Sequence, residues 1–514
     1  MINVYCTQAY TKKSNGMQLH ITHNYTCAIN VLHPRTRNNV LDQLSYLRFL
    51  SVLQNMVFSV FTIRTCDEEK EWPQILAIGI GSLVSLSMGM LTTWTSPYIP
   101  VLLQDKESYS ISPEEASYLP SIAPVVATLT IPLLFTLPDR IGRKYTLLLA
   151  AIPYFICWVL TALARGIYVF YLSRAFEGIS DGLVFSALSM YAGEVATPKV
   201  RGVWGNGLTV FNYIGQFFIN VIGPHLTIQQ SSYIGMTIPV FFVVLFSLMP
   251  ESPYYFLMKK RDEDARKSLQ WLHCTMDVNK YLAQIKEDVE RQMSERGTWA
   301  ELFTIKANRK AWIAGTFLRI AQQFSGLSVL YAYTKYIFEL SHSSISPNVS
   351  IVLFTGLNCI LNVVSSFSSH YLGRRKSFIL SLLFCSFSMA PLAVYFYILE
   401  FHPELDVSHY RWVPLASMLS YISSAAFGVA IIPSLMYSEL FSASIKAKGI
   451  CILLMQAGVI STAVNLLFYY MSTSFGTYSP FVLFSVSAMS SSILSIYFVP
   501  ETQGKTLEEI QQSL

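Results

Sequence analysis

Apolar runs long enough to cross a membrane recur along most of the chain, from Ile75 to the last residues. A helix needs about 20 consecutive, mainly apolar residues to span the hydrocarbon layer. Twelve segments meet this requirement: Ile75–Tyr98, Ser117–Leu137, Tyr145–Ala164, Ile167–Tyr191, Val203–Pro224, Ser231–Met249, Trp312–Phe338, Val349–Tyr371, Phe378–Leu399, Val413–Tyr437, Ile450–Tyr470 and Phe481–Val499. The pattern predicts an all-α membrane protein with twelve transmembrane helices.

The first 71 residues fit this plan poorly. Leu44–Ile63 is apolar, but Arg48, Gln54 and Asn55 interrupt it. We interpret residues 1–71 as a cytoplasmic extension that is disordered or carries an interfacial helix. A further membrane span and an artefact of gene prediction are the alternatives.

A charged loop separates the sixth and seventh runs. Residues 251–310 hold 12 Lys or Arg and 10 Asp or Glu, so this loop is expected in water, with short amphipathic helices such as Val278–Gln292. The predicted parts are the extension 1–71, a six-helix bundle 72–250, the loop 251–310, a second six-helix bundle 311–499 and a cytoplasmic tail 500–514.

Composition agrees with a membrane protein and narrows the chemistry. Of 514 residues, 52% are apolar and only 13% are charged, too few charges for an ordinary soluble protein. The net charge of +5 comes from short basic clusters beside apolar runs, which does not favour nucleic-acid binding. The eight cysteines lack the paired spacing of zinc sites or disulfide scaffolds. We expect no metal and no cofactor, with a lipid bilayer as the surroundings.

Basic residues between the runs indicate the orientation, because Lys and Arg collect in the cytoplasmic loops of membrane proteins. The loops after runs two, four, eight and ten carry Arg140, Arg143, Lys144, Lys199, Arg201, Arg374, Arg375, Lys376, Lys446 and Lys448. The alternate loops carry Lys106, Arg165 and Arg411. Both termini are therefore predicted in the cytoplasm, and the Asn348-Val-Ser350 sequon outside, as a candidate glycosylation site.

Three short motifs occur twice in the same order. The first copies are Asp139-Arg-Ile-Gly-Arg-Lys144, Glu194 with Arg201, and Pro250-Glu-Ser252. The second copies are Tyr371-Leu-Gly-Arg-Arg-Lys376, Glu439 with Lys446, and Pro500-Glu-Thr502. An ordered set at nearly one spacing predicts two homologous halves of six helices.

The charges of these motifs predict contacts at the cytoplasmic surface, because arginines pair with carboxylates and with helix C-termini. Glu194 with Arg201, and Glu439 with Lys446, are interpreted as latches that hold the halves together there. The other candidate latch residues are Asp139, Arg140, Arg143, Arg374 and Arg375. The alternative is that these charges only set the topology.

Together with further signatures, these motifs resemble the sugar porters of the major facilitator superfamily. The further signatures are Arg174 with Gly178 and Gly182, Tyr191-x-x-Glu194, Gln322-Gln-x-Ser-Gly326 and Pro500-Glu-Thr-x-Gly-Lys-Thr506. Thr95-Ser-Pro97, Glu114-Glu-Ala116 and Pro253-Tyr-Tyr255 are most similar to the facilitated trehalose transporter-like members of insects. The resemblance covers residues 72–512 and implies the superfamily's fold, sugar transport and alternating access.

Polar residues inside the runs predict a cavity, because burying them unpaired costs several kcal/mol. Run seven carries Gln322, Gln323, Ser325 and Ser328, and run eight carries Asn358 and Asn362. Amides suit polyols because each both donates and accepts hydrogen bonds. The resemblance implies that Gln322, Gln323 and Asn358 contact the sugar; hydrogen bonds between helices are the alternative.

Other positions depart from the family pattern. Thr209 and Ser328 stand where many hexose porters have Gln and Asn, and Ser434 stands in a reduced run-ten motif. Gly458 replaces the usual tryptophan of run eleven. These changes should enlarge the cavity and remove hydrogen bonds that select a pyranose. Glucose is therefore not favoured as the substrate; the alternatives are a disaccharide or another polyol as substrate, or a paralogue with weak activity. His370 replaces the usual acid after run eight and should weaken the second latch.

Ionisable residues in the runs predict the driving force. Run one has none from Pro73 to Gln104, which favours facilitated diffusion over proton symport. Run four carries Arg174, Glu177 and Asp181 on one helical face. We interpret Arg174 with Glu177 as a compensated pair. Asp181, with no evident local partner, is the alternative proton-coupling residue.

The sequence thus predicts a transporter, expected in the plasma membrane, that moves trehalose, a hexose or a related polyol by facilitated diffusion. Two alternatives remain: a proton-coupled sugar symporter, and a sensor on the transporter fold that moves no substrate. A membrane enzyme is not favoured, because the chain has no phosphate-binding glycine loop, no metal-ligand histidine spacing and no hydrolase serine motif.

Overall fold

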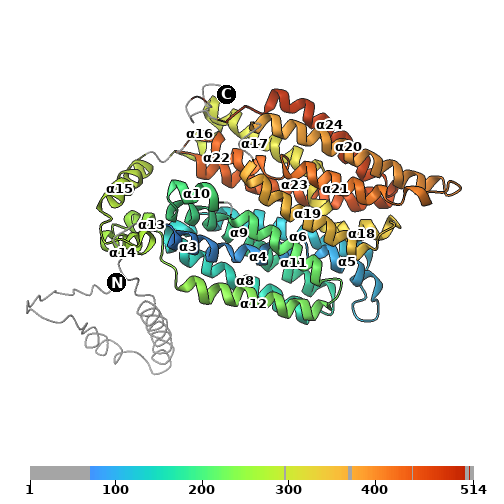
Figure 1. The fold of residues 1–514 in the computed structure, drawn as a ribbon, viewed down its shortest axis with the longest axis horizontal. Helices are drawn as coiled ribbons and strands as arrows, with labels where there is room; N and C mark the ends of the chain where they lie inside the picture. The colour runs from blue at the N-terminus through green and yellow to red at the C-terminus, as the bar shows by residue number, and fades with distance from the viewer. Residues whose placement is uncertain are drawn as a thin grey trace, which may run out of the picture. The chain divides into compact units, whose positions relative to one another are not determined.

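The computed structural model describes residues 70–205, 207–294, 297–368, 373–442, 444–503 and 509, and most of them are helical. Long helices run side by side, and short helices gather at one end (Figure 1). The apolar stretch Leu44–Ile63, His370 and the end of the tail motif lie outside the described residues. The predictions made for them stay predictions.

The first six apolar runs all form helices. Run one is a helix over Trp72–Gln104, divided into α3 (Trp72–Ser82), α4 (Val84–Thr92) and α5 (Thr95–Gln104). The next five are α6 (Pro113–Leu134), α8 (Arg143–Leu163), α9 (Ile167–Val195), α11 (Gly207–Ile222) and α12 (Ile228–Ser247). Short helices α7 (Leu137–Ile141) and α10 (Pro198–Trp204) connect them. We call these helices the first set.

The last six runs form the second set. Its members are α17 (Lys306–Phe324) with α18 (Leu327–Leu340), α19 (Pro347–Ser368), α20 (Arg374–Phe401), α21 (Val413–Ala426) with α22 (Ile432–Leu440), α23 (Lys446–Ser474) and α24 (Ser479–Phe498). A 3₁₀ turn, η1 (Ser408–Tyr410), precedes α21. Each predicted run coincides with one of these helices or helix pairs to within a few residues.

By length and apolar composition alone, eight helices of the described chain qualify as membrane spans. The other four predicted runs differ in ways that lower this count. Helix α9 carries four charged residues, α11 has only 16 residues, and runs seven and ten are each broken into two shorter helices.

The breaks in runs seven and ten expose backbone groups inside the bundle. Between α17 and α18, Gly326 has a φ of +96°, a left-handed conformation that favours glycine. Between α21 and α22, the N–H of Val429 donates to Ser381 Oγ at 3.0 Å, and its carbonyl accepts from Gln322 Nε2 at 2.7 Å. Side chains therefore satisfy the freed backbone, as non-helical segments inside a membrane protein require.

The charged loop forms four short helices at one end of the bundle (Figure 1). They are α13 (Pro253–Met258), α14 (Asp262–His273), α15 (Asn279–Ser294) and α16 (Trp299–Thr304). The amphipathic helix predicted at Val278–Gln292 is confirmed by α15. We call this end the terminal face, because α3 begins there and α24 ends there, and the other end the opposite face.

Glycines allow helices to approach closely. A Cβ on Gly89 of α4 would lie 1.9 Å from the carbonyl oxygen of Asn212 on α11. Between the two sets, a Cβ on Gly458 of α23 would lie 2.1 Å from Thr128 Oγ1 on α6. Gly458 therefore lets α23 approach α6 closely, and it also lines the cavity between the two sets, so the larger cavity expected at this position stays a prediction.

Candidate functional site

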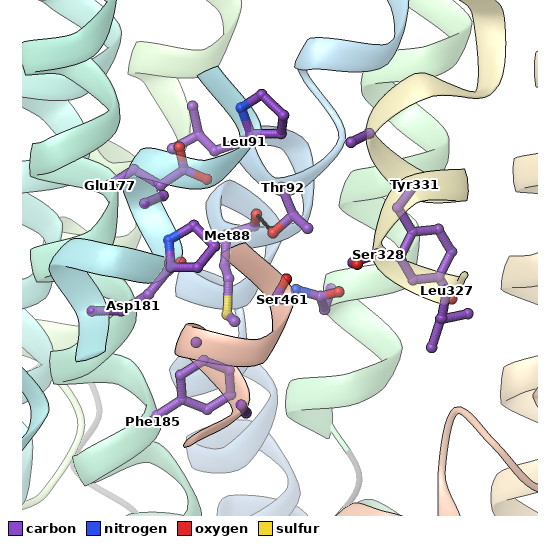
Figure 2. Close-up of a pocket in the computed structure, with 18 of the residues that line it drawn as sticks. Met88, Leu91, Thr92, Glu177, Asp181, Phe185, Leu327, Ser328, Tyr331 and Ser461 are labelled. Atoms are coloured by element: carbon purple, nitrogen blue, oxygen red, sulfur yellow. Dashed lines mark hydrogen bonds between the residues drawn. The ribbon is translucent and has the colours of Figure 1, made fainter. Parts of the chain in front are cut away.

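A cavity of about 360 Å³ lies between the two sets of helices, within the size range of small-molecule sites. Helices α4, α6, α9 and α11 line one side, and α17, α18, α22 and α23 line the other. Figure 2 shows Glu177 and Asp181 on one side, Ser328 and Tyr331 of α18 on the other, and Ser461 of α23 between them.

Hydrogen bonds between the sets lie on the side of the cavity toward the opposite face. Thr95 Oγ1 on α5 donates to the carbonyl of Ala332 on α18 at 3.2 Å. The backbone N–H of Lys335 donates to Ser96 Oγ at 3.3 Å. These bonds join α5 and α18, which lie together at that end in Figure 1. The two sets are therefore in direct contact on this side of the cavity.

Four cavity-lining side chains have buried oxygens with no hydrogen-bond partner among the described residues. They are Gln323 Oε1, Ser328 Oγ, Tyr331 Oη and Asn465 Oδ1. Leaving such an atom unpaired costs about 1–3 kcal/mol, so these oxygens are suited to bind ligand hydroxyls. Gln323 and Ser328 lie where the sequence predicted. Asn465 was missed, although an asparagine inside the apolar run eleven was a usable signal.

The two adjacent glutamines of α17 differ. Gln322 lines the cavity, but its Nε2 donates to the carbonyl of Val429 and its Oε1 accepts from Arg319 Nη1 at 2.5 Å. Gln322 therefore braces the break between α21 and α22, while Gln323 keeps a free acceptor. The predicted residues Thr209 and Ser434 also line the cavity.

Asn358 lies behind the cavity wall. Its side chain is 1% exposed, its Nδ2 donates to Gln216 Oε1 at 3.4 Å, and its Oδ1 accepts from Asn362 Nδ2 at 2.6 Å. Gln216 lines the cavity and donates to Asn212 Oδ1 at 2.8 Å. Asn358 does not line the cavity in this structure and contacts it through Gln216, so the predicted sugar contact stays a prediction. The lining amides Asn212 and Gln216 were missed.

Three charged residues of α9 line the cavity together. Arg174 and Glu177 form an ion pair at 2.8 Å with both side chains almost fully buried, so the predicted compensated pair is confirmed. Arg174 also donates to the carbonyl of Leu91 at 3.3 Å and lies 4.8 Å from the Trp94 ring centre. These contacts fix the guanidinium within the first set.

Asp181 has a partner that the sequence did not reveal. The hydroxyl of Tyr154 on α8 donates to Asp181 Oδ1 at 2.6 Å. The expectation that Asp181 lacks a local partner is therefore wrong. Tyr154 lies 27 residues earlier in the chain, and the two side chains meet only because α8 packs against α9.

Arg143, the first residue of α8, is the centre of the first basic motif. Its guanidinium pairs with Asp139 at 3.1 Å and with Glu194 at 2.9 Å. Glu251, between α12 and α13, accepts the backbone N–H groups of Arg143 and Lys144 at 3.1 and 3.0 Å. Burial raises the pKa of Glu251, against these backbone bonds, which lower it.

Arg374 repeats this arrangement at the start of α20. It pairs with Glu439 at 3.3 Å, and Glu501 accepts the backbone N–H groups of Arg374 and Arg375 at 3.0 and 3.2 Å. The internal repeat of the sequence is therefore visible as one arrangement in space, built twice.

This arrangement corrects the predicted pair Glu194–Arg201, and it shows that Glu439 pairs with Arg374 in addition to its electrostatic attraction to Lys446. Arg143 and Arg374 take the two carboxylates, and Arg201 donates to the carbonyl of Ala196 at 3.1 Å. Each of these ion pairs joins helices of one set. In this structure they hold each set together at the terminal face and do not latch one set to the other.

Two sets of membrane helices around a cavity that carries polar and charged side chains are typical of a membrane transporter. A family profile described as "Sugar (and other) transporter" matches residues 99–514, and the chain belongs to this family. It is therefore a multi-pass membrane protein and a sugar porter, not an enzyme.

Relatives in insects support this assignment. The chain is 30% identical over 447 residues to a facilitated trehalose transporter Tret1 of Culex quinquefasciatus, with 86% of each chain covered. It is also 30% identical to a Tret1 of Apis mellifera ligustica, covering 85% of this chain and 88% of the relative.

Solved structures show the same fold. The inward-open xylose transporter XylE of E. coli matches with a TM-score of 0.69 at 19% identity, covering 85% of this chain and 99% of XylE. XylE bound to 6-bromo-6-deoxy-D-glucose matches with a TM-score of 0.67 at 20% identity, covering 86% and 100%. The chain has the fold of the major facilitator superfamily, with twelve helices in two six-helix halves, as predicted.

Proposed function

We propose that this protein moves a sugar across the plasma membrane by facilitated diffusion, with the cavity open to one face at a time. The main support is that buried oxygens of Gln323, Ser328 and Asn465, around a cavity between the two halves, have no hydrogen-bond partner within the described residues. Trehalose, a hexose and a related polyol are the candidate substrates. The hydrogen bonds between α5 and α18 support a state that is closed at the opposite face, one of the two states that alternating access requires.

We also propose that the terminal face is cytoplasmic, as the basic loops indicate. Asn348, at the start of α19, is exposed on the opposite face, where a glycan would be added. The domain boundaries 72–250, 251–310 and 311–499 are proposed on the same basis. In the other state, exposed residues such as Arg140 would be able to contact the second half.

Uptake by proteoliposomes tests this function. The full-length protein would be reconstituted and given labelled trehalose, glucose and a panel of polyols, with protein-free liposomes as the control. Saturable uptake of at least one sugar that stops at equilibrium supports facilitated diffusion. Absence of uptake for every member of the panel favours a sensor on the transporter fold.

Proton-coupled symport is the second candidate, because Asp181 and Glu177 line the cavity. An ionisable residue inside a membrane span is a functional hypothesis by default. An imposed pH gradient that drives uphill accumulation, and an Asp181→Asn variant that abolishes this accumulation, would establish coupling. The pairing of Glu177 with Arg174 and of Asp181 with Tyr154 supports uniport.

A further inference from the structure

Arg319 of α17 is a positive charge that transport of a neutral sugar does not require. It lines the cavity, and its guanidinium lies 4.7 Å from the ring centre of Tyr437 on α22. One of its nitrogens donates to Gln322, while its buried Nε has no partner in the described chain. Within the described residues, Arg319 forms no ion pair.

The acids of the cavity do not neutralise Arg319 in this structure. Glu177 is paired with Arg174, and Asp181 accepts from Tyr154, all within the first half. Arg319 lies on the wall of the second half. Arg319 is partly buried, and a partly buried guanidinium without an acid is costly, a cost that stacking on Tyr437 offsets only in part. One wall of the cavity therefore carries a guanidinium, that of Arg319, with which an anionic ligand can pair.

The chemistry of this wall suits a carboxylate next to hydroxyl groups. A guanidinium presents planar donors that bind a carboxylate through two parallel hydrogen bonds. Gln323 is four residues along the helix from Arg319, on the same face, and keeps a free acceptor for hydroxyls. We propose, on the basis of the sugar transport proposed above, that the substrate is an acidic sugar whose carboxylate binds Arg319. Uronic and aldonic acids have this chemistry.

Asp181 on the facing wall fixes the orientation of such a substrate. A carboxylate accepts hydrogen bonds from hydroxyls and repels another carboxylate. The acid group therefore points to Arg319, and the hydroxyl groups point to α9. The competing role for Arg319 is a gate in which it pairs with Asp181 when the terminal face closes.

Uptake of glucuronate and glucose by proteoliposomes tests the proposal, because the two share a ring and differ in charge. We expect wild-type protein to take up glucuronate at least about tenfold faster than glucose, since hydrogen bonds to charged groups contribute about 1.5–3 kcal/mol. Arg319→Gln should lower glucuronate uptake about 10- to 100-fold and lower glucose uptake much less, because glucose has no carboxylate to lose its partner. Arg319→Lys should keep most of the glucuronate uptake. Arg309→Gln, exposed on the same helix, is the matched control.

Three results would overturn the proposal. If wild type takes up glucuronate and glucose at equal rates, and Arg319→Gln does the same, the acidic-sugar proposal is rejected while the proposed sugar transport stands. Loss of both activities in Arg319→Gln, restored by combining Arg319→Asp with Asp181→Arg, identifies a gate. No uptake of any sugar by wild type rejects the proposed function as well. If Arg319→Gln does not fold, thermal stabilisation of wild type by glucuronate and not by glucose supports the proposal, and equal stabilisation rejects it.

Discussion

The two walls of the cavity use their polar residues in opposite ways. On α9, Arg174 and Glu177 pair at 2.8 Å, and Tyr154 bonds to Asp181, so the charges are satisfied inside the first half. On α17 and α18, Gln323 and Ser328 keep buried oxygens without partners in the described chain. The difference teaches that charged residues of a membrane span can be structural on one wall of a cavity, while the facing wall keeps groups that are available to a ligand.

The largest expected effect comes from breaking the ion pair of α9. Arg174→Met leaves Glu177 buried without its partner, which should destabilise the protein by about 3–5 kcal/mol. Thermal unfolding of the purified protein in detergent measures the loss, with the exposed Arg165→Met as the control. Combining Arg174→Met with Glu177→Met should recover most of the stability. If the double variant is no more stable than the single one, the pair is not the main cause.

Substituting Gln323, a predicted ligand contact on the facing wall, should change the rate of transport and not the stability of the protein. Gln323→Ala removes a ligand contact and should lower uptake about tenfold, as expected for a lost hydrogen bond of about 1.5 kcal/mol, with an unchanged unfolding temperature. Gln322→Ala should lower both, because it leaves the carbonyl of Val429 without this donor. The exposed Gln229→Ala is the control for expression and folding. Normal uptake by folded Gln323→Ala would reject the assigned site.

The smallest expected effect is that of Asp181→Asn. The amide oxygen can still accept from the Tyr154 hydroxyl, so stability should change by less than about 1 kcal/mol. Under facilitated diffusion, glucose uptake between pH 6 and 8 should also stay close to that of wild type, because the amide oxygen of the variant can still accept hydrogen bonds from sugar hydroxyls. A strong loss that appears only when uptake runs against a gradient would show that this wall is functional after all, and the contrast between the walls would fail.

The fold was largely predictable because its signals are long or repeated. Twelve apolar runs and three duplicated motifs do not depend on any single residue, so errors at the helix ends did not affect the result. The breaks in runs seven and ten were harder to locate. They depend on Gly326 and on side-chain bonds such as Gln322 to Val429, which join residues 107 positions apart.

The candidate site was only partly predictable. Gln323, Ser328, Thr209 and Ser434 line the cavity as expected, because polar residues in apolar runs must face water or a partner. The same rule does not distinguish these two outcomes. Asn358 was predicted to contact the sugar, whereas in the structure it does not line the cavity and donates to Gln216.

Charge partners were the least predictable feature. Pairs such as Tyr154 with Asp181 and Arg143 with Glu194 form between different helices, and no local spacing in the sequence reveals them. Arg319 was also overlooked, although an arginine within an apolar run is a strong signal in its own right.

Gly458 has a mechanical consequence. Because it lacks a side chain, the backbone of α23 rests directly on α6, where Thr128 also donates to the carbonyl of Met455 at 3.2 Å. At this contact no large side chain lies between α23 and α6, so a rotamer change at position 458 cannot open a path there. Opening a path requires the two helices to move apart. Gly458→Ala should therefore push α23 away from α6 and change the equilibrium between the two conformations of the transporter.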